Sequence, residues 1–515
     1  MPTVDDLAAA VRRALIAASA ESDIVEAETF ASWNNLLNAR LNFTSAIPCN
    51  GVEEPKSSSG HGIGITLVLR DPAGGPPRVG FGSETADLSD DGIRVAIDRA
   101  RRAAVADPDF RSLPRPTAGE RTLRHYHNPA LMELGNEDLV GAGWQVLEAA
   151  LRAFRQDERL GIGDDPARAA ALRLITGGDV TVLQERMAVA STAMPEPQAD
   201  ESAVLMAFAT AMVERDEAKG SGWSATTRLA EFHGTAGRDA AAASVDAMGG
   251  VRVPSGEHDV VFGPQAVADL CTYLLAPSLS AGTVYARSSP FNGKLGQQVG
   301  VSELQVVDDG AMPGYPGSKG ITCEGLPTGR TELIKDGRVC AFLCNWYEAE
   351  RLRHAPDAAE RLGPDLAKHP LALLPRNGFR FGTGGGRRHD RQAGVAATNF
   401  IVSSSRPVPR DELLRRVGDG LYIGRIWYTY PVNGLRAADF TCTVVGDSFV
   451  IRGGRLAEPL QANALRVNDN LLRVLQSVLG IGPNPRPVLV WAADEITHAP
   501  EIAVRGVPCT AITRA

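Results

Sequence analysis

Residues 301–337 read VSELQVVDDGAMPGYPGSKGITCEGLPTGRTELIKDG, and this stretch decides how the C-terminal half of the chain is organised. An alternating apolar segment leads into Asp308 and Asp309, and a loop rich in proline and glycine follows. A Cys-Glu-Gly-Leu-Pro turn, an arginine and a second apolar segment then lead to Asp336 and Gly337. This order predicts a strand, a long loop, a turn and a second strand. Residues 338–345 are again apolar, so we expect them to pair back across the Asp-Gly turn as a β-hairpin.

The order of acidic, glycine and proline residues in this stretch resembles the signature of the C-terminal domain of the TldD/PmbA family. The matching residues are Asp308, Asp309, Glu324, Gly325, Pro327, Arg330, Leu333, Ile334, Asp336 and Gly337. Segments 397–401, 419–423 and 437–440 resemble later strands of the family, and the resemblance covers nearly the full length. It implies proteins that assemble as dimers, enclose a cleft between their halves and cleave peptide bonds.

The composition is that of a globular protein, with 44% hydrophobic and 22% charged residues in a chain of 515. The net charge is −8 and no basic stripe is present, so nucleic acid is not an expected partner. Seven scattered cysteines make no disulfide framework, which predicts a reducing, cytoplasmic location. The N-terminal segment MPTVDDLAAAVRRALIAASA lacks the features of a signal peptide, and no stretch approaches ~18 consecutive apolar residues. We therefore expect no membrane association.

Three segments are predicted to form domains: residues 1–113, 114–248 and 249–515. In the first, Thr3 with Asp6 and then Ser89 mark the starts of two helices. Residues 63–70 and 78–82 read as paired strands, whereas residues 50–61, rich in Gly, Ser and Pro, read as a mobile loop. In the central segment, a predicted helix is followed by alternating apolar and polar residues, the pattern of a strand.

Together these elements predict an α+β fold, with an N-terminal half of helices packed on a mixed sheet and a β-rich C-terminal half.

In the catalytic subunit of the family that this chain resembles, a helix carries HExxxH and a late cysteine completes the metal site. Two imidazoles at that spacing reach one metal, and the glutamate activates water. The matching helix here is AVADLCTYLLAPSL, which has Thr272, Tyr273 and Pro277 at the motif positions. Trp491, or a neighbour, falls near the position of the late cysteine. The chain thus resembles the PmbA (TldE-type) branch, and we expect neither a metal site of that kind nor a cofactor.

Cys323 lies in the most distinctive loop of the chain, beside Glu324. A nucleophilic cysteine needs a base to form its thiolate, and His354 and His389 are the candidates. Cys323, Glu324 and His354 are therefore candidate catalytic residues. The alternative is that Cys323 is an ordinary loop cysteine without a catalytic role. Glu324 could equally form a structural ion pair with Arg330 that fixes the hairpin.

Four residues are candidate substrate contacts: Arg330, Asn399, Tyr422 and Trp427. Asn399 and Tyr422 belong to segments that resemble strands of the family. Trp427 and the Tyr428 that follows it stand where the family prefers small residues. An aromatic cluster at this place would suit a specific small substrate.

The glycine-rich segment 381–389, FGTGGGRRH, could cradle a phosphate through backbone amides. It lacks the Walker lysine and spacing, so a flexible loop is the favoured interpretation. If the loop moves, Arg387 and Arg388 could meet an anionic substrate tail.

Three hypotheses for the function follow. The leading one is a non-metal member of a cytoplasmic peptidase system acting on peptide or other amide bonds, in complex with a metal-bearing TldD-type chain or as a homodimer. The second is an autonomous, metal-independent enzyme that cleaves or forms an amide bond with a cysteine nucleophile, which thiol alkylation would reveal. The third is a non-catalytic scaffold subunit.

Overall fold

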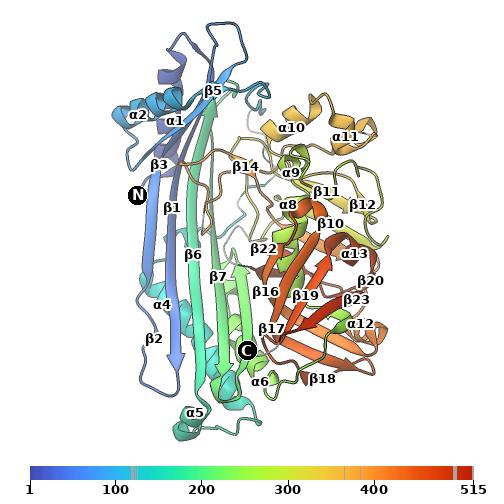
Figure 1. The fold of residues 1–515 in the computed structure, drawn as a ribbon. Coiled ribbons are helices and arrows are strands. Elements are labelled where there is room, and N and C mark those ends of the chain that lie inside the picture. Colours follow the sequence, from blue (N-terminus) through green and yellow to red (C-terminus); the bar gives the residue numbers. More distant parts are fainter. Residues whose placement is uncertain are drawn as a thin grey trace.

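The computed structural model describes residues 1–117, 121, 123–124, 126–364, 366–382, 384–490 and 496–512. A long β-sheet runs through the N-terminal half, and the C-terminal half lies against it (Figure 1). The predicted α+β class is confirmed, with helices packed on the N-terminal sheet and strands more abundant in the C-terminal half. In the described part of the chain, no helix combines the length and the apolar character needed to cross a membrane.

The N-terminal sheet has the strand order β5-β4-β3-β1-β6-β7-β8, with β2 also paired to β1. All pairings among these described strands are antiparallel, so the sheet is not the mixed one that the sequence predicts. Short connections join most neighbouring strands, and only antiparallel strands can be joined in this way. The strands are β1 (Ile24–Thr44), β2 (Gly51–Val52), β3 (Lys56–Leu69), β4 (Arg78–Thr85), β5 (Val105–Ala106), β6 (Leu174–Ser191), β7 (Gln198–Val213) and β8 (Ala218–Thr226).

Strands from residues 1–113 and 114–248 share this sheet, because β1 pairs with β6 from Glu28↔Ser191 to Thr44↔Ile175. The predicted domain division stays a prediction. The mobile loop predicted for residues 50–61 is wrong at Gly51–Val52, which form β2, and from Lys56 onward, where β3 begins. Its backbone pairs with β1 while its first side chains are exposed, so the Ser- and Gly-rich composition reflects solvent exposure rather than an irregular backbone.

The two faces of the sheet pack against different parts of the chain, because successive strand residues point to opposite faces. Leu37 and Ala39 of β1 belong to the apolar core beneath α4 (Asn136–Gln156) and α6 (Thr235–Asp246). Leu36 and Asn38 point the other way, toward the C-terminal half. Nearer the other end of the sheet, α1 (Val4–Ser19) and α2 (Asp90–Ala103) cover the same face as α4. Short helices α3 (Ala130–Glu133), α5 (Pro166–Leu172), η1 (Glu214–Asp216) and η2 (Leu229–Glu231) complete this half.

The predicted helix starts are confirmed by their caps. The Thr3 hydroxyl accepts the Asp6 N–H at 3.1 Å, and the Asp6 carboxylate accepts the Thr3 N–H at 2.8 Å. The Ser89 hydroxyl accepts the Gly92 N–H at 3.4 Å at the start of α2. These bonds satisfy backbone donors that have no partner inside the helix.

The C-terminal half contains two larger sheets and a small one. The first has the order β12-β11-β10-β15-β22-β21, and the second has the order β16-β9-β23-β19-β17-β18 with β20 on β23. The largest apolar core of the described chain draws its residues from both sheets and from the helices between them. The strands are β9 (Gly256–Phe262), β10 (Leu304–Asp309), β11 (Arg330–Lys335), β12 (Arg338–Val339), β13 (Gly378–Phe379), β14 (Gly394–Val395), β15 (Phe400–Ser404), β16 (Gly420–Pro431), β17 (Asp439–Arg452), β18 (Arg455–Pro459), β19 (Leu465–Asn470), β20 (Val478–Ile481), β21 (Arg486–Leu489), β22 (Ile496–Ala499) and β23 (Ile502–Ala511).

One helix of this half changes its winding. Helix α7 (Pro264–Leu270) continues as the π-helical turn η3 (Cys271–Leu275) and ends in α8 (Ala276–Ser278). Single π-turns inside helices are frequent at functional sites. The other helices are α9 (Ala281–Tyr285), α10 (Trp346–Arg353), α11 (Ala358–Leu362), α12 (Arg410–Val417), α13 (Leu471–Gln476), η4 (Leu366–Lys368) and η5 (Leu435–Ala437).

The predicted hairpin after β11 is confirmed at its turn, but the returning strand predicted for residues 338–345 ends at Val339. Strands β11 and β12 pair across Asp336 and Gly337, which have φ values of 50° and 72°. Positive φ at both central residues is the type I′ turn that Asp-Gly favours. The long loop between β10 and β11 is largely buried between the two halves of the protein.

Candidate functional site

A cavity of about 630 Å³ lies between the N-terminal sheet and the C-terminal half. One wall is the sheet face opposite α4 and α6, and the other consists of α7, η3, β16 and β21. The volume is in the range of small-ligand sites. The lining residues are Leu36, Asn38, Asp179, Thr181, Met206, Phe208, Thr210, Gln265, Asp269, Tyr273, Gly384, Arg425, Ile426, Trp427, Tyr428, Thr429, Leu489 and Val490.

Strand β16 turns two consecutive aromatic side chains into this cavity. In a regular strand neighbours point to opposite faces, but β16 and β17 change register between Trp427 and Tyr430. Tyr428 has a positive φ of 53° within this bulge. The rings of Trp427 and Tyr428 meet edge to face with centroids 5.3 Å apart. The predicted aromatic cluster is therefore present, and Trp427, the predicted substrate contact, lines the cavity.

Polar groups converge on the same cavity from α7 and β16. The Gln265 amide donates to the Asp269 carboxylate at 2.7 Å, and its oxygen accepts the Ile426 N–H at 3.1 Å. Burial raises the pKa of Asp269 to about 6. Arg425 projects from β16, with its guanidinium carbon 5.2 Å from the centroid of the Phe208 ring. The cavity thus combines an aromatic wall with the cation Arg425 and two acids, Asp179 and Asp269, of which Asp269 has the raised pKa.

The helix predicted from the sequence to correspond to the family's metal-binding helix borders this cavity. Tyr273 lines the cavity, and the Thr272 hydroxyl lies 3.2 Å from that of Thr497. Thr272, Tyr273 and Pro277 offer neither imidazole nor carboxylate, so they do not fit the metal that the family's catalytic subunit holds. No group of three His, Cys, Asp or Glu side chains that could hold a metal occurs among the described residues. Trp491 lies outside the described residues.

A buried ionic cluster joins the sheet to the C-terminal half. Lys319 lies 2.6 Å from Glu185, and Arg387 lies 2.7 Å from Asp200, with all four side chains at least nine-tenths buried. Tyr126 donates to Asp200 at 2.6 Å, and the Arg387 N–H donates to Glu185 at 2.8 Å. Burial alone would raise the pKa of Glu185, but Arg387 and Lys319 lower it below its usual range. These hydrogen bonds offset the cost of burying charge.

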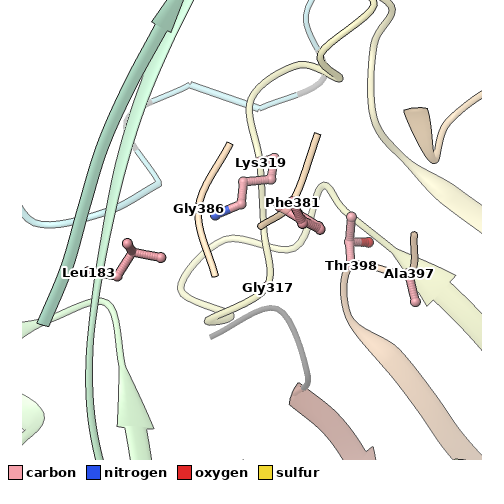
Figure 2. Close-up of a pocket in the computed structure, with 7 residues that line it drawn as sticks. All are labelled: Leu183, Gly317, Lys319, Phe381, Gly386, Ala397 and Thr398. Atoms are coloured by element: carbon pink, nitrogen blue, oxygen red, sulfur yellow. The ribbon is translucent and has the colours of Figure 1, made fainter. Parts of the chain in front are cut away.

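Figure 2 shows Lys319 extending from its loop toward Gly386. The space beside it measures only about 10 Å³, so this junction is closely packed and has no room for a ligand. Because Arg387 is fully buried and paired, the prediction that it meets an anionic substrate tail is wrong. Arg388 is paired with Asp390 at 2.6 Å. The sequence GGGRRH could not reveal that Arg387 is buried and paired, since the partners of Arg387 lie on distant strands.

Cys323 lies in a small apolar cluster, fully buried, with Phe30, Met187 and Phe379 among its neighbours. Burial raises the pKa of its thiol to about 12, which disfavours the thiolate that a nucleophile needs. Its sulfur accepts the Arg380 N–H at 3.4 Å.

The candidate bases have other partners. His354 is exposed at the end of α10, with its Nδ1 2.8 Å from the Glu350 carbonyl oxygen. His389 lies between the hydroxyls of Ser32 and Thr85 at 3.3 and 3.1 Å, and burial lowers its pKa to about 4. The structure therefore brings neither histidine into hydrogen-bond contact with Cys323.

Glu324 and Arg330 do not form the predicted ion pair. Glu324 is buried and accepts the Trp346 N–H at 3.0 Å, whereas Arg330 is exposed on β11. Burial raises the pKa of Glu324 to about 8. The carboxyl therefore stays mostly protonated at neutral pH, and its neighbour is a backbone amide rather than a guanidinium.

Asn399 and Tyr422 bind other parts of the protein. The Asn399 amide donates to the Asp309 carbonyl at 2.7 Å and its oxygen accepts the Gly317 N–H at 2.9 Å, which fixes the loop after β10. The Tyr422 hydroxyl donates to Glu501 at 2.9 Å, and the Tyr422 ring belongs to a separate apolar cluster. Among the predicted substrate contacts, Trp427 lines the large cavity, and the other three do not.

Sequence reasoning missed three charged residues of the cavity: Asp179, which pairs with Arg40 at 3.3 Å, Asp269 and Arg425. Asp269 and Arg425 are each the single charged residue within an apolar run, AVADLCTYLL and LYIGRIWY. A lone charge on an otherwise buried helix or strand is a signal for a polar site, because an unpaired buried charge is costly. That signal could have identified both.

A family model described as PmbA/TldA metallopeptidase C-terminal domain matches residues 255–511, and one described as PmbA/TldA metallopeptidase domain 1 matches residues 50–104. The crystal structure of TldE from Thermococcus kodakarensis superposes with a TM-score of 0.75 at 16% identity, over 97% of this chain and 100% of that one. At this identity the likeness shows the fold.

Two relatives carry the name Metalloprotease. The protein from Synechocystis sp. is 28% identical over 187 residues, which make up 36% of this chain and 34% of that protein. The protein from Methanothermobacter thermautotrophicus is 24% identical over 233 residues, or 45% of this chain and 44% of that protein. The matched segments thus span less than half the length of each relative.

Proposed function

Since the chain belongs to the TldD/PmbA family, we propose that it acts in a peptidase system as the non-metal, peptide-binding member, in complex with a metal-bearing TldD-type chain. The observation that carries this proposal is the cavity beside η3. It lies at the helix where the family's catalytic subunit has its HExxxH motif, yet Thr272, Tyr273 and Pro277 supply no metal ligands there. Tyr273, at one of these positions, joins Trp427 and Tyr428 of β16 among the aromatic residues of the cavity wall.

In this role the chain binds and orients peptide, and the partner supplies the cleavage chemistry. Trp427 and Tyr428 offer flat apolar surface, while Asp269 and Arg425 offer polar contacts at the cavity wall. The proposed setting is the cytoplasm, where the seven free cysteines of the chain would stay reduced. The burial of Cys323 gives the cysteine-nucleophile alternative no support.

The test is an assay of the purified chain with unfolded peptides, alone and after addition of a metal-bearing TldD-type chain, with and without chelator. We expect turnover only with the partner, and loss of that turnover on chelation. Size-exclusion chromatography of the mixture separates a heterodimer from a homodimer. Chelator-insensitive turnover by the chain alone that disappears in Cys323→Ala would contradict the proposal and favour the cysteine enzyme.

A matched pair of tryptophan variants tests the cavity itself. Trp427 in the cavity and Trp144 on α4 have similar exposed fractions, 37% and 39%. Trp427→Ala should raise the KM of the complex by up to about tenfold, because it removes an aromatic contact to the peptide. Trp144→Ala should leave KM unchanged. Equal effects of the two substitutions would place the peptide outside this cavity.

A further inference from the structure

One guanidinium that lines the cavity, that of Arg425, lies over the Phe208 ring and has no acceptor among the described residues. Arg425 forms no hydrogen bond or ion pair with any residue that the structure describes, although it is partly buried. The fully buried arginines Arg380 and Arg387, by contrast, both form hydrogen bonds and ion pairs. An arginine has five N–H donors, and no nitrogen of Arg425 is among the buried side-chain atoms without a hydrogen-bond partner in the described residues. The donors of Arg425 are therefore not sealed off, and they are available to a ligand in the cavity.

The strand geometry directs Arg425 to the place where two cavities meet. The register of β16 and β17 shifts between Arg425 and Ile426, and the residue opposite Arg425 is Gly446, which has no side chain. A second cavity of about 320 Å³ is also lined by Arg425, Trp427 and Tyr428. Bulges next to functional sites commonly re-aim a side chain in this way.

The charges around Arg425 favour a ligand with a single negative charge. Asp269 and Asp447 influence it electrostatically without forming an ion pair with it, and burial raises the pKa of each carboxyl to about 6. Near neutral pH these acids would repel a dianion such as phosphate more strongly than a monoanion. A carboxylate also matches the planar guanidinium fork through two parallel hydrogen bonds.

The rest of the cavity suits an apolar body attached to that carboxylate. Phe208, Tyr273, Trp427 and Tyr428 contribute aromatic surface around Arg425. The volume of about 630 Å³ suits a short segment rather than a long stretch of polypeptide. A peptide carries one carboxylate at its end, directly beside its last side chain.

We propose that Arg425 binds the C-terminal carboxylate of a peptide whose last side chain lies against the aromatic wall of Phe208, Trp427 and Tyr428. This assignment rests on the proposed peptide-binding function and deepens it. It makes the cavity a site for peptide ends, with Arg425 as the residue that distinguishes a free acid from an amide.

The test is isothermal titration of the purified chain with an N-acetylated alanine peptide ending in phenylalanine, as the free acid and as the C-terminal amide. The wild type should bind the acid about ten- to one-hundredfold more tightly than the amide. Arg425→Gln should remove this preference, and Arg425→Lys, which keeps the charge but loses the fork, should reduce it. The control is Arg410→Gln, because Arg410 also lies over an aromatic ring, that of Tyr422, but outside the cavity. It should retain the preference.

Several results would overturn the assignment. Equal affinity for acid and amide in the wild type would do so, as would an unchanged preference in Arg425→Gln. If Arg425→Gln does not fold, as judged by circular dichroism, the Arg425→Lys variant decides. The same preference for the free acid in Arg425→Lys as in the wild type would overturn the assignment. An amidated peptide with an internal aspartate that binds as tightly as the free acid would assign Arg425 to side-chain carboxylates instead.

Failure of the proposed function gives a different pattern. If neither peptide binds, peptide binding by this chain is contradicted, and phenylacetate then serves as the probe. Binding of phenylacetate to the wild type but not to Arg425→Gln would keep the carboxylate site and reject the peptide. No binding of either probe would reject both.

Discussion

Replacing Glu324 by glutamine should stabilise the protein increasingly as the pH rises from 5 to 8. The folded protein holds the pKa of this buried carboxyl at about 8, against an ordinary value of 4.5. Between these values the unfolded chain releases a proton that the folded chain retains, so the wild type loses stability with rising pH. Full ionisation of both states would cost the folded state up to about 5 kcal/mol. Glutamine has a similar shape and no proton to release, so it escapes this loss.

Part of this stability penalty can be measured within a practical pH range. Between pH 5 and pH 7.5 the penalty grows by about 3 kcal/mol. With an unfolding entropy of ~2.1 cal/mol/K per residue, a chain of this length should show a change of about 3 °C in Tm. The quantity to measure is the Tm of Glu324→Gln minus that of the wild type, by differential scanning calorimetry at both pH values. Any constant cost of altering the bond to Trp346 cancels in this comparison.

The control is Glu332→Gln on β11, which removes the same charge from a partly exposed pair with Lys335. Its Tm difference from the wild type should be nearly the same at both pH values, because exposed pairs contribute little. A pH-independent difference for Glu324→Gln, or one that shrinks as the pH rises, would refute the reasoning. It would mean that Glu324 is ionised in the folded protein and lies in a more polar environment than its burial indicates.

Three further predictions concern the ionic cluster, the thiols and the cavity. Lys319→Met should lower the free energy of unfolding by about 3 kcal/mol, since it leaves the buried Glu185 carboxylate with Arg387 as its remaining ion-pair partner, whereas Lys335→Met at the surface should cost at most about 1 kcal/mol; urea denaturation compares them. Iodoacetamide should modify exposed Cys49 in the native protein and leave buried Cys323 unmodified, as peptide mass spectrometry can show, and rapid modification of Cys323 would contradict its burial. Phenylacetate should bind the wild type more tightly at pH 5.5 than at pH 7.5, because an acid with a pKa of about 6 loses its negative charge, and Asp269→Asn should weaken this dependence.

Local elements of the fold could be predicted because their signals lie within a few residues. The hairpin at Asp336 and Gly337 follows from a dipeptide that tolerates two positive φ values. The caps at Thr3 and Ser89 follow from side chains that reach the next turn. In each of these cases the residues that determine the structure are neighbours in the sequence.

The long sheet and the cavity could not be predicted in the same way, since their contacts join distant segments. The antiparallel pairing of β1 with β6 depends on residues more than a hundred positions apart, and no local pattern encodes it. The burial of Cys323 and of Arg387 likewise depends on strands from the other half of the protein. A Gly- or Pro-rich segment indicates an irregular backbone, but it does not indicate whether that backbone is exposed.

The position of β1 at the centre of the sheet has a consequence for biosynthesis. Its partner β6 follows about 130 to 160 residues later, so at ~5–20 residues per second one edge of β1 waits roughly 7 to 30 s for its neighbour. A 21-residue strand with an unpaired edge can pair with another chain in that time. A fragment of residues 1–113 should therefore self-associate, which light scattering can measure. Both β1 and β6 must be synthesised before β1 has a partner on each side. Slow folding and a need for chaperones are therefore expected properties of this chain.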